Sequence, residues 1–327
     1  MKVTLHEVAA RAKVSIATVS RTLNGLPVSE QSRRRVEQAV AELGYVANEA
    51  ARALRSDRSM TMGLIFLDLR NMLGLDLADA LSEAIEAAGY SLLISTARGD
   101  AGRYDLLMYR FLERRVDALF CIRPPGGGDS LARYQRAGVP VMAMFSADGD
   151  FAATPTLSPL FSEPTRALHQ HLVEGGHARV AVLRPEAGGG ASDALTRGLR
   201  ELGLAVEVVT LSAAGGVRDA LSGLISRPDR PTAILAPDPA VRALISVCAA
   251  TGLAIPGDLS VISVCDISAE AHHRRAGLSA VMVDPHRMGR AAGAAMLDWL
   301  AGAPPDGRVG IQVATFTARK TSGARAP

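Results

Sequence analysis

The stretch Leu5–Asn24, LHEVAARAKVSIATVSRTLN, decides the fold of the N-terminal part of the chain. Thr4 stands three residues before Glu7, which is the spacing of a capping box. This spacing predicts a helix that starts directly after Thr4. After a short turn, Ser15 is a good N-cap for a second helix over 16–24. Apolar residues recur at helical spacing in both segments, at Leu5, Val8, Ala9 and Ala12 and then at Val19 and Leu23.

A third helix is expected over about residues 29–43, with Gly44 as the stop at its C-terminal end. Asn24-Gly25 and Pro27 end the second helix. Two short helices joined by a tight turn and braced by a third form a helix-turn-helix, whose second helix enters the major groove of DNA. The N-terminal part of the chain is therefore predicted to bind double-stranded DNA.

The charge distribution points to the same partner. Residues 1–60 carry ten Lys/Arg and six Asp/Glu, whereas the other 267 residues carry 26 and 27. A basic head on a neutral body favours nucleic acid as the partner of the head.

The same stretch resembles the LacI/GalR family of repressors. The matching blocks are Val14-Ser15, Ala17–Arg21, Leu23-Asn24, Leu43–Tyr45 and Asn48–Leu54. The resemblance implies a sequence-specific transcriptional regulator that binds a palindromic operator as a homodimer and is controlled allosterically by a small ligand.

By this resemblance, Ile16, Ala17 and Arg21 occupy the positions that contact bases. The planar guanidinium of Arg21 suits O6 and N7 of guanine, and Ile16 and Ala17 offer apolar contact to a thymine methyl group. Phosphate contacts are implied for Thr4, Thr18, Ser20 and Asn24. The run Arg33–Arg35 is either a further set of phosphate contacts or a solvated helix face.

Residues Asn48–Arg55 resemble the hinge helix of the family. Isolated helices shorter than about 12–15 residues are marginal in water, so this segment is expected to order only on DNA and to act as a switch. Leu54 matches the side chain that wedges into the minor groove, and Ala51 and Arg55 are expected beside it.

The remainder of the chain alternates apolar runs with amphipathic helices, such as those over 77–88 and 164–174. Near-continuous apolar strands joined by helices predict parallel sheets that are covered on both faces. The expected fold is a small all-α head on an α/β body of two doubly wound lobes. The strand-like runs are Met62–Leu67, Ser91–Ile94, Val116–Ile122, Val139–Met144, Val180–Leu183, Val206–Val209, Thr232–Ala236 and Leu259–Val264.

The body resembles a periplasmic sugar-binding protein, with two lobes and three crossovers, and this implies a ligand at the strand ends. Several family positions that grip sugar hydroxyls carry other residues here: Leu195 replaces an arginine and Cys265 an aspartate. Asp238 is retained, whereas Leu160-Phe161 replaces an Asp-Asn pair. A neutral sugar held in the usual way is therefore not expected.

Four arginines, Arg70, Arg98, Arg123 and Arg184, each follow an apolar strand within a few residues. Loops at the carboxyl ends of parallel strands converge, so these arginines suggest an anionic ligand such as a sugar phosphate or sugar acid. Alternatively, they are solvated or paired with Asp68, Asp100 or Glu186. A further possibility is a regulator with a protein co-regulator or no small effector.

Composition narrows the class of protein. The chain has 327 residues and is 48% hydrophobic, but no apolar run approaches the ~18 residues of a spanning helix. No signal-peptide core follows Met1, so a bacterial cytoplasmic protein, associated with the nucleoid when on its operator, is expected. No catalytic motif and no third ligand beside His169 and His171 are found, so we expect neither an enzyme nor a cofactor or metal. The three cysteines, Cys121, Cys248 and Cys265, are expected to be buried thiols.

We therefore expect residues 1–46 to form the DNA-binding domain and residues 47–59 the hinge. Residues 60–327 would bind the effector and dimerise, with lobe 1 at about 60–158 and 286–315 and lobe 2 at about 159–285 and 316–327. The predicted function is repression of a carbohydrate or carbon-metabolism operon.

Overall fold

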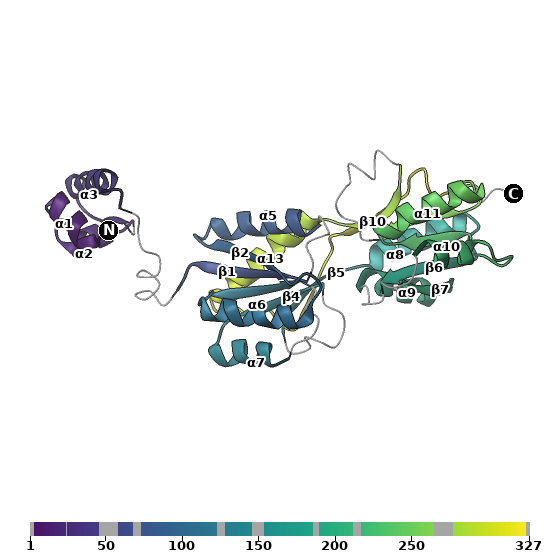
Figure 1. The fold of residues 1–327 in the computed structure, drawn as a ribbon, viewed down its shortest axis with the longest axis horizontal. Helices are drawn as coiled ribbons and strands as arrows, with labels where there is room; N and C mark the ends of the chain where they lie inside the picture. Colours follow the sequence, from purple (N-terminus) through teal and green to yellow (C-terminus); the bar gives the residue numbers. More distant parts are fainter. Residues whose placement is uncertain are drawn as a thin grey trace. The chain divides into compact units, whose positions relative to one another are not determined.

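The computed structural model describes residues 3–23, 25–45, 58–67, 73–122, 128–145, 154–185, 190–211, 217–264 and 277–324. The chain divides into two compact units, Met1–Ser59 and Met60–Pro327. We call the first unit the head and the second the body (Figure 1).

The head consists of α1 (Leu5–Ala12), α2 (Ile16–Leu23) and α3 (Glu30–Leu43). Thr4 Oγ1 accepts a hydrogen bond from the Glu7 backbone N–H at 3.4 Å, and the Glu7 carboxylate accepts one from the Thr4 backbone N–H at 2.7 Å. The predicted capping box is therefore confirmed.

Two further predicted helix ends in the head, at Ser15 and Gly44, are also confirmed. Ser15 Oγ accepts a hydrogen bond from the Thr18 backbone N–H at 3.1 Å and so caps α2. Gly44 ends α3 in the left-handed conformation, with φ at 59°. The three helices enclose a small core made of Val8, Ala9, Ala12, Val19, Val36 and Ala39.

Lobe 1 of the body contains a six-stranded parallel sheet in the order β11-β5-β4-β3-β1-β2. Helices α5 and α13 pack on one face of the sheet, and α6 and α7 pack on the other (Figure 1). The elements are β1 (Thr61–Phe66), α5 (Leu73–Glu86), β2 (Ser91–Thr96), α6 (Ala101–Glu113), β3 (Ala118–Ile122), α7 (Gly128–Ala137), β4 (Val141–Met144), β5 (Thr156–Pro159), α13 (Pro285–Leu300) and β11 (Arg308–Ile311).

Lobe 2 repeats this arrangement with the strand order β12-β10-β9-β8-β6-β7. Its sheet lies between α8 and α9 on one face and α10 and α11 on the other. The elements are α8 (Ser162–Glu174), β6 (Arg179–Pro185), α9 (Gly190–Glu201), β7 (Ala205–Leu211), α10 (Val217–Ile225), β8 (Ala233–Ala236), α11 (Asp238–Thr251), β9 (Ser260–Val264), β10 (Ser279–Val283) and β12 (Ala314–Thr317).

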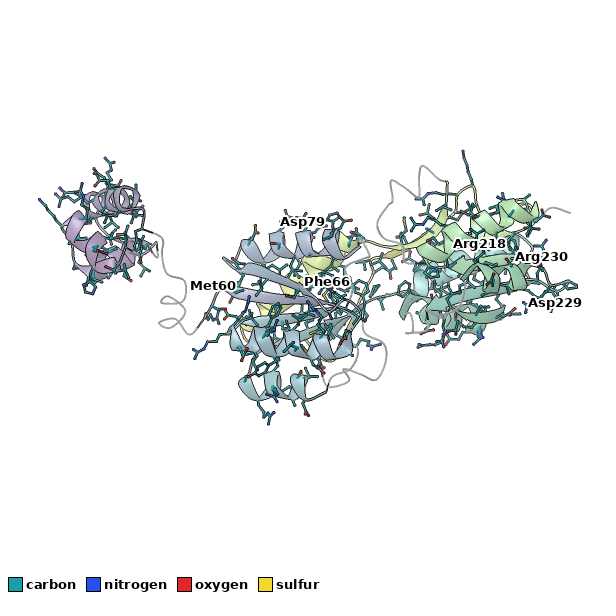
Figure 2. All side chains as sticks on the ribbon, viewed as in Figure 1. Met60, Phe66, Asp79, Arg218, Asp229 and Arg230 are labelled. Carbon is teal, nitrogen blue, oxygen red and sulfur yellow. The ribbon has the colours of Figure 1, made fainter. Side chains whose placement is uncertain are left out.

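The predicted fold class is confirmed, because the apolar runs form the central strands of two covered sheets. Strands β3, β4, β8 and β9 are buried along their whole length. Strand β1 is buried from Met62 to Phe66, and Figure 2 labels Phe66, the last residue of this strand. The helices predicted over 77–88 and 164–174 correspond to α5 and α8. Among the described residues, no helix combines the length and the apolar composition needed to cross a bilayer.

The sequence pattern indicated only eight strands, whereas the two sheets have six strands each. The sequence pattern missed β5, β10, β11 and β12. Three of them have only four residues, and β11 and β12 are partly exposed, so neither shows an apolar run. Strand β12 also runs antiparallel to β10, in contrast to the expected all-parallel sheet.

The missed strands are the ones that join the lobes to each other. The chain passes from one sheet to the other between β5 and β6, between β10 and β11, and between β11 and β12. Each sheet is therefore completed by a strand from the C-terminal part of the chain.

The segment after β12 is fastened to lobe 2 by hydrogen bonds. The Thr321 hydroxyl donates to the Val261 carbonyl at 2.7 Å, and buried His177 Nε2 donates to the Gly323 carbonyl at 3.0 Å. His171 Nε2 lies 2.8 Å from Ser322 Oγ, and its ring contacts Phe316. These contacts connect α8 and β9 to the end of the described chain.

The contact between α5 and α13 yields a first prediction. A Cβ atom added at Gly289 of α13 would lie 2.5 Å from the Leu77 carbonyl oxygen and 2.9 Å from the Leu81 nitrogen, both backbone atoms of α5. Gly289→Ala must therefore move the helices apart, and we expect it to lower the free energy of unfolding by about 1–3 kcal/mol. Urea unfolding followed by circular dichroism measures this change.

Gly223→Ala is the matched control, because Gly223 lies in α10 with nothing within 4 Å of an added Cβ atom. Alanine is favoured over glycine inside a helix by roughly 0.5–1 kcal/mol, so this variant should equal or exceed the wild type in stability. A Gly289→Ala protein as stable as the Gly223→Ala protein would contradict the close approach of α13 to α5.

The His171 contact predicts a dependence of stability on pH. Burial lowers the pKa of His171, although Glu174 opposes the shift in part. The folded protein therefore binds this proton less readily than the unfolded chain, whose histidine pKa is about 6.5. The contribution of neutral His171 is complete above that value and is lost as the pH falls below it and through the lower pKa of the folded state.

His171→Gln should remove this contribution while keeping a polar group that reaches Ser322. Melting temperatures at pH 8 and pH 5 should show a larger decrease for the wild type than for the variant. Equal decreases would show that His171 does not titrate with folding.

Candidate nucleic-acid interface and ligand-binding edges

The α2 helix presents its N-terminal end to solvent. Val19 is fully buried and anchors the helix to the head core, whereas Ile16 is 39% exposed and Ala17 and Arg21 are exposed. The first turn of α2 holds no acidic residue, so no negative side chain of this helix neutralises the positive potential at its N-terminal end. Such a helix end favours phosphate and other anions.

The three predicted base-contacting residues share this exposed surface. Ile16 and Ala17 are in the first turn, and Arg21 follows Ala17 by four residues, one turn along the helix. Within the described part of the chain, no ion pair or side-chain hydrogen bond engages the Arg21 guanidinium. Its five N–H donors are therefore available to an acceptor.

The residues predicted to contact phosphates differ in whether their side chains already form other hydrogen bonds. The Thr4 hydroxyl already donates to Glu7 at 2.9 Å, and half-buried Thr18 shares a hydrogen bond of 2.9 Å with Ser15 Oγ. Both hydroxyls thus stabilise helix starts, a role that the predicted assignment did not include. Ser20 is half-buried and has a partner of its own, and Asn24 lies outside the described residues.

Some of the other arginines of the head form ion pairs, and others are exposed to solvent. Arg11 pairs with Glu42, and Arg34 pairs with Glu30 at 3.1 Å. Arg33 and Arg35 are exposed on α3. The predicted hinge residues Ala51, Leu54 and Arg55 lie outside the described residues.

In lobe 1, the structure describes one of the predicted effector arginines. Arg98 follows β2 in a tight turn with a left-handed backbone (φ 57°), and Thr96 Oγ1 accepts its backbone N–H at 3.3 Å. Its side chain is exposed at the carboxyl edge of the sheet. Arg70 and Arg123 lie outside the described residues.

In lobe 2, Arg184 lies inside β6 rather than after it, one residue before the end of the strand. Its Nη1 donates to Asp193 Oδ1 of α9 at 3.2 Å, and its Nε donates to Thr210 Oγ1 of β7 at 3.3 Å. Pairing with a carboxylate, one of the alternatives for this arginine, is observed with Asp193, whereas the suggested partners Asp68 and Glu186 lie outside the described residues. A nine-residue separation gave no sign of this pair.

The other predicted effector residues of lobe 2 do not gather at one surface. Leu195 is 0% exposed and packs in the core between α8, α9 and the sheet, so it offers no surface to a ligand. Asp238 starts α11 directly after β8, the strand beside β6. Its position therefore lies on the same carboxyl edge as Arg184, and Cys265 lies outside the described residues.

Sequence reasoning missed a further polar group near this edge. Ser263, one residue before the end of β9, is 0% exposed, and its hydroxyl has no hydrogen-bond partner in the part of the chain that is described. In those same ranges, no group of three or more His, Cys, Asp or Glu is placed to hold a metal ion. Cys121 and Cys248 are buried free thiols, as predicted.

Comparisons with known proteins agree with both units. Residues 4–48 match the model of the lacI family of bacterial regulatory proteins, and residues 169–322 match a periplasmic binding protein-like domain. The structure is similar to the Lac repressor dimer bound to operator and the anti-inducer ONPF, with a TM-score of 0.85 at 23% identity over 99% of this chain and 100% of that chain. The likeness to that structure concerns the fold alone.

Curated relatives are transcriptional regulators. The maltose regulon regulatory protein MalI of Escherichia coli is 35% identical over 209 residues, 61% of this chain and 57% of that protein, so the match spans little more than half of the length of MalI. The repressor PurR of Erwinia tasmaniensis is 27% identical over 90% of this chain and 89% of its own length. Catabolite control protein A of Priestia megaterium is 26% identical over 80% and 82%.

Proposed function

We propose that this chain, a member of the LacI family of bacterial regulatory proteins, represses transcription of carbohydrate or carbon-metabolism genes by binding a palindromic operator. The observation that supports this most directly is the end of α2, which exposes Ile16, Ala17 and an uncommitted Arg21 guanidinium. The names of the relatives, a maltose regulon regulator and a catabolite control protein, support the metabolic context. We assign no enzymatic activity.

In this proposal, α2 lies in the major groove with its N-terminal turn at the base edges. Arg21 pairs with guanine, and Ile16 and Ala17 contact apolar base edges. The helix start and Thr18 fix the position of α2 on the phosphates, with Thr4, Ser20 and Asn24 as further contacts. The hinge segment, including Ala51, Leu54 and Arg55, orders in the minor groove at the centre of the operator.

A palindromic operator calls for a dimer with twofold symmetry. The edge strand β2 carries Ile94, which is 44% exposed, and the neighbouring helix α5 carries Leu75, which is 55% exposed. Figure 2 shows Asp79 on the outward side of the same helix. Exposed apolar edge strands are prone to pair with another chain, so we place part of the dimer contact at β2 and α5.

The ligand in this proposal is an anionic sugar derivative bound at the carboxyl edges of the two sheets. Arg98 from lobe 1 and Arg184 from lobe 2 would bind its charged groups, with Arg70, Arg123, Asp238 and Cys265 as further candidates. We leave Leu195 out of this set because it is buried in the core. Ligand binding would act on the hinge through the three connections between the two sheets. The protein would work in the bacterial cytoplasm.

A second candidate is a LacI-family regulator that responds to a protein co-regulator or to no small molecule. The buried, apolar Leu195 favours it, because this position lacks a hydroxyl-binding side chain. The two candidates share the DNA-binding function and differ in what they bind at the body.

Operator binding gives the main test. Arg21→Ala should weaken binding to the enriched palindrome by about 2–6 kcal/mol per dimer, because each of two arginine–guanine pairs contributes roughly 1–3 kcal/mol. The operator is found by selecting genomic fragments with the purified protein, and affinities are measured by fluorescence anisotropy at one salt concentration.

Arg136→Ala is the control, because Arg136 is an exposed arginine of α7 in the body. It should bind the palindrome as the wild type does. The proposal fails if no palindrome is enriched, or if the Arg21→Ala protein retains wild-type affinity for it.

Calorimetry with the full chain tests the ligand class. Sugar phosphates and sugar acids should bind at least tenfold more tightly than their neutral parent sugars, since hydrogen bonds between charged groups contribute about 1.5–3 kcal/mol. Arg98→Gln and Arg184→Gln should each reduce the preference for the anion.

Asp193→Asn separates binding from structure, because it breaks the Arg184 ion pair and keeps the arginine. It should preserve or strengthen anion binding. Binding of neutral sugars alone would exclude the anionic ligand, and binding of none would favour the second candidate.

A further inference from the structure

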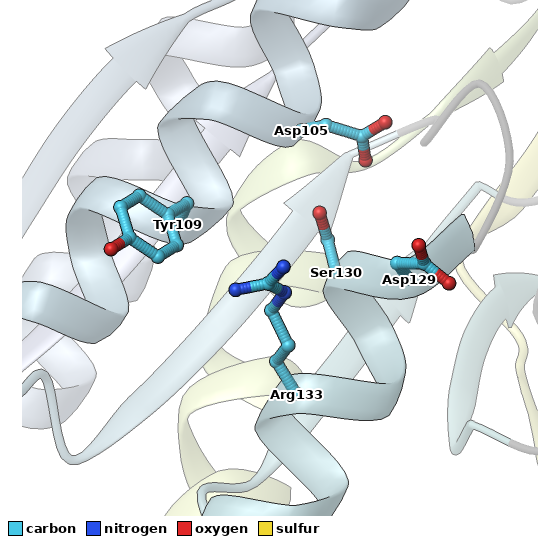
Figure 3. A pocket seen from close by; sticks show the side chains of 5 residues that line it. All are labelled: Asp105, Tyr109, Asp129, Ser130 and Arg133. Carbon is cyan, nitrogen blue, oxygen red and sulfur yellow. The ribbon is translucent and has the colours of Figure 1, made fainter.

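The groove between α6 and α7 on lobe 1 is lined by polar side chains that neither the DNA interface nor the ligand edges use. The groove is open to solvent and has a volume of about 550 Å³. Figure 3 shows that two side chains come from α6 and three from α7. They are Asp105, Tyr109, Asp129, Ser130 and Arg133.

The groove contains a hydroxyl and two carboxylates that have no hydrogen-bond or ion-pair partner among the described residues. Ser130 is only 9% exposed, and its hydroxyl points into the space between the two helices (Figure 3). No hydrogen bond to this hydroxyl is formed within the described residues. Asp105 and Asp129 likewise have no ion-pair partner there, although Arg133 lines the same groove. The Ser130 hydroxyl is therefore free to accept a hydrogen bond from a ligand.

Arg133 is held in a way that leaves its donors accessible. Its guanidinium carbon lies 5.5 Å from the centre of the Tyr109 ring, which is a cation–π contact. Such stacking uses the face of the guanidinium and leaves the N–H groups on its edge for a carboxylate.

The floor of the groove is fixed by buried tyrosines. The Tyr134 hydroxyl donates to the Met108 carbonyl at 2.8 Å and ties α7 to α6. The Tyr104 hydroxyl donates to the Ile65 carbonyl of β1 at 3.3 Å. Both tyrosines are fully buried, so the two walls of the groove are held at a set separation before any ligand binds.

We propose that this groove binds a small zwitterion with an ammonium group and a carboxylate, such as an amino acid. An ammonium group has three N–H donors, and Asp105, Asp129 and Ser130 supply three acceptors. The carboxylate is bound by Arg133, and Tyr109 covers the carbon chain between the two charges. One arginine against two aspartates gives the groove a net negative charge, which favours the ammonium end of the ligand.

The position of the groove gives such a ligand a route to the regulator. Helix α6 begins a few residues after β2, beyond the Arg98 turn, and α7 follows β3. A ligand that bridges these helices therefore restrains two of the segments that follow the strand ends of lobe 1. The groove is a second input to the protein, independent of the sugar-derived ligand proposed above.

Titration calorimetry of the full chain tests the proposal with three zwitterions of increasing charge separation: L-alanine, γ-aminobutyrate and 6-aminohexanoate. At least one should bind. The amine and the carboxylic acid of matching chain length, for example n-butylamine and butyrate, should bind at least tenfold more weakly than that zwitterion.

Variants then locate the site. Asp129→Asn and Arg133→Gln should each weaken binding of the best zwitterion at least tenfold, and Ser130→Ala should weaken it by a smaller factor. Arg136→Gln and Glu113→Gln change exposed charges on the same two helices outside the groove and should leave binding unchanged. Melting temperatures verify that each variant is folded.

Three outcomes would overturn the proposal. None of the zwitterions binds; the amine binds as tightly as the zwitterion and is insensitive to Arg133→Gln; or binding persists in both the Asp129→Asn and the Arg133→Gln proteins.

Discussion

The close contact of α13 with α5 is the constraint on which the body depends. Helix α13 follows β10 of lobe 2 and precedes β11 of lobe 1, so it returns the chain to the first sheet after the second is almost complete. Gly289 allows backbone contact with α5 that any larger residue would prevent. The buried face of α5 in turn covers β1, the strand that directly follows the linker from the head. Helices α13 and α5 and strand β1 therefore belong to one tightly packed core, and such cores transmit strain between neighbouring elements.

The head was predictable because its signals are local. A capping box at Thr4, an N-cap at Ser15 and a left-handed glycine at Gly44 each specify a helix end within a few residues, and the structure forms all three. The central strands of the body were predictable for a related reason. A strand buried on both faces is mostly apolar, and β3, β4 and β8 consist of apolar residues alone, whereas β9 also carries the buried Ser260 and Ser263.

What could not be predicted depends on contacts between distant segments. Strands β5, β11 and β12 have four residues each and exist because a neighbouring strand supplies hydrogen bonds. The pairing of Arg184 with Asp193 needs the strand and helix to pack side by side, which no spacing rule indicates. The α6–α7 groove also depends on such contacts, because Ser130 lines it only when the Tyr134 hydrogen bond holds α7 against α6. Sequence patterns describe each helix there and say nothing of the space between them.

The Arg184–Asp193 pair also bears on what kind of ligand can bind at lobe 2. Both side chains are more than a third exposed, and exposed ion pairs contribute only about 0–1 kcal/mol. An anion that engages the guanidinium through two oxygen atoms gains more than the pair loses, because bidentate, charge-assisted contacts are stronger. A neutral hydroxyl gains less and must still compete with a full carboxylate. In the proposed ligand site, Asp193 would therefore favour phosphate or carboxylate ligands at Arg184 over neutral sugars.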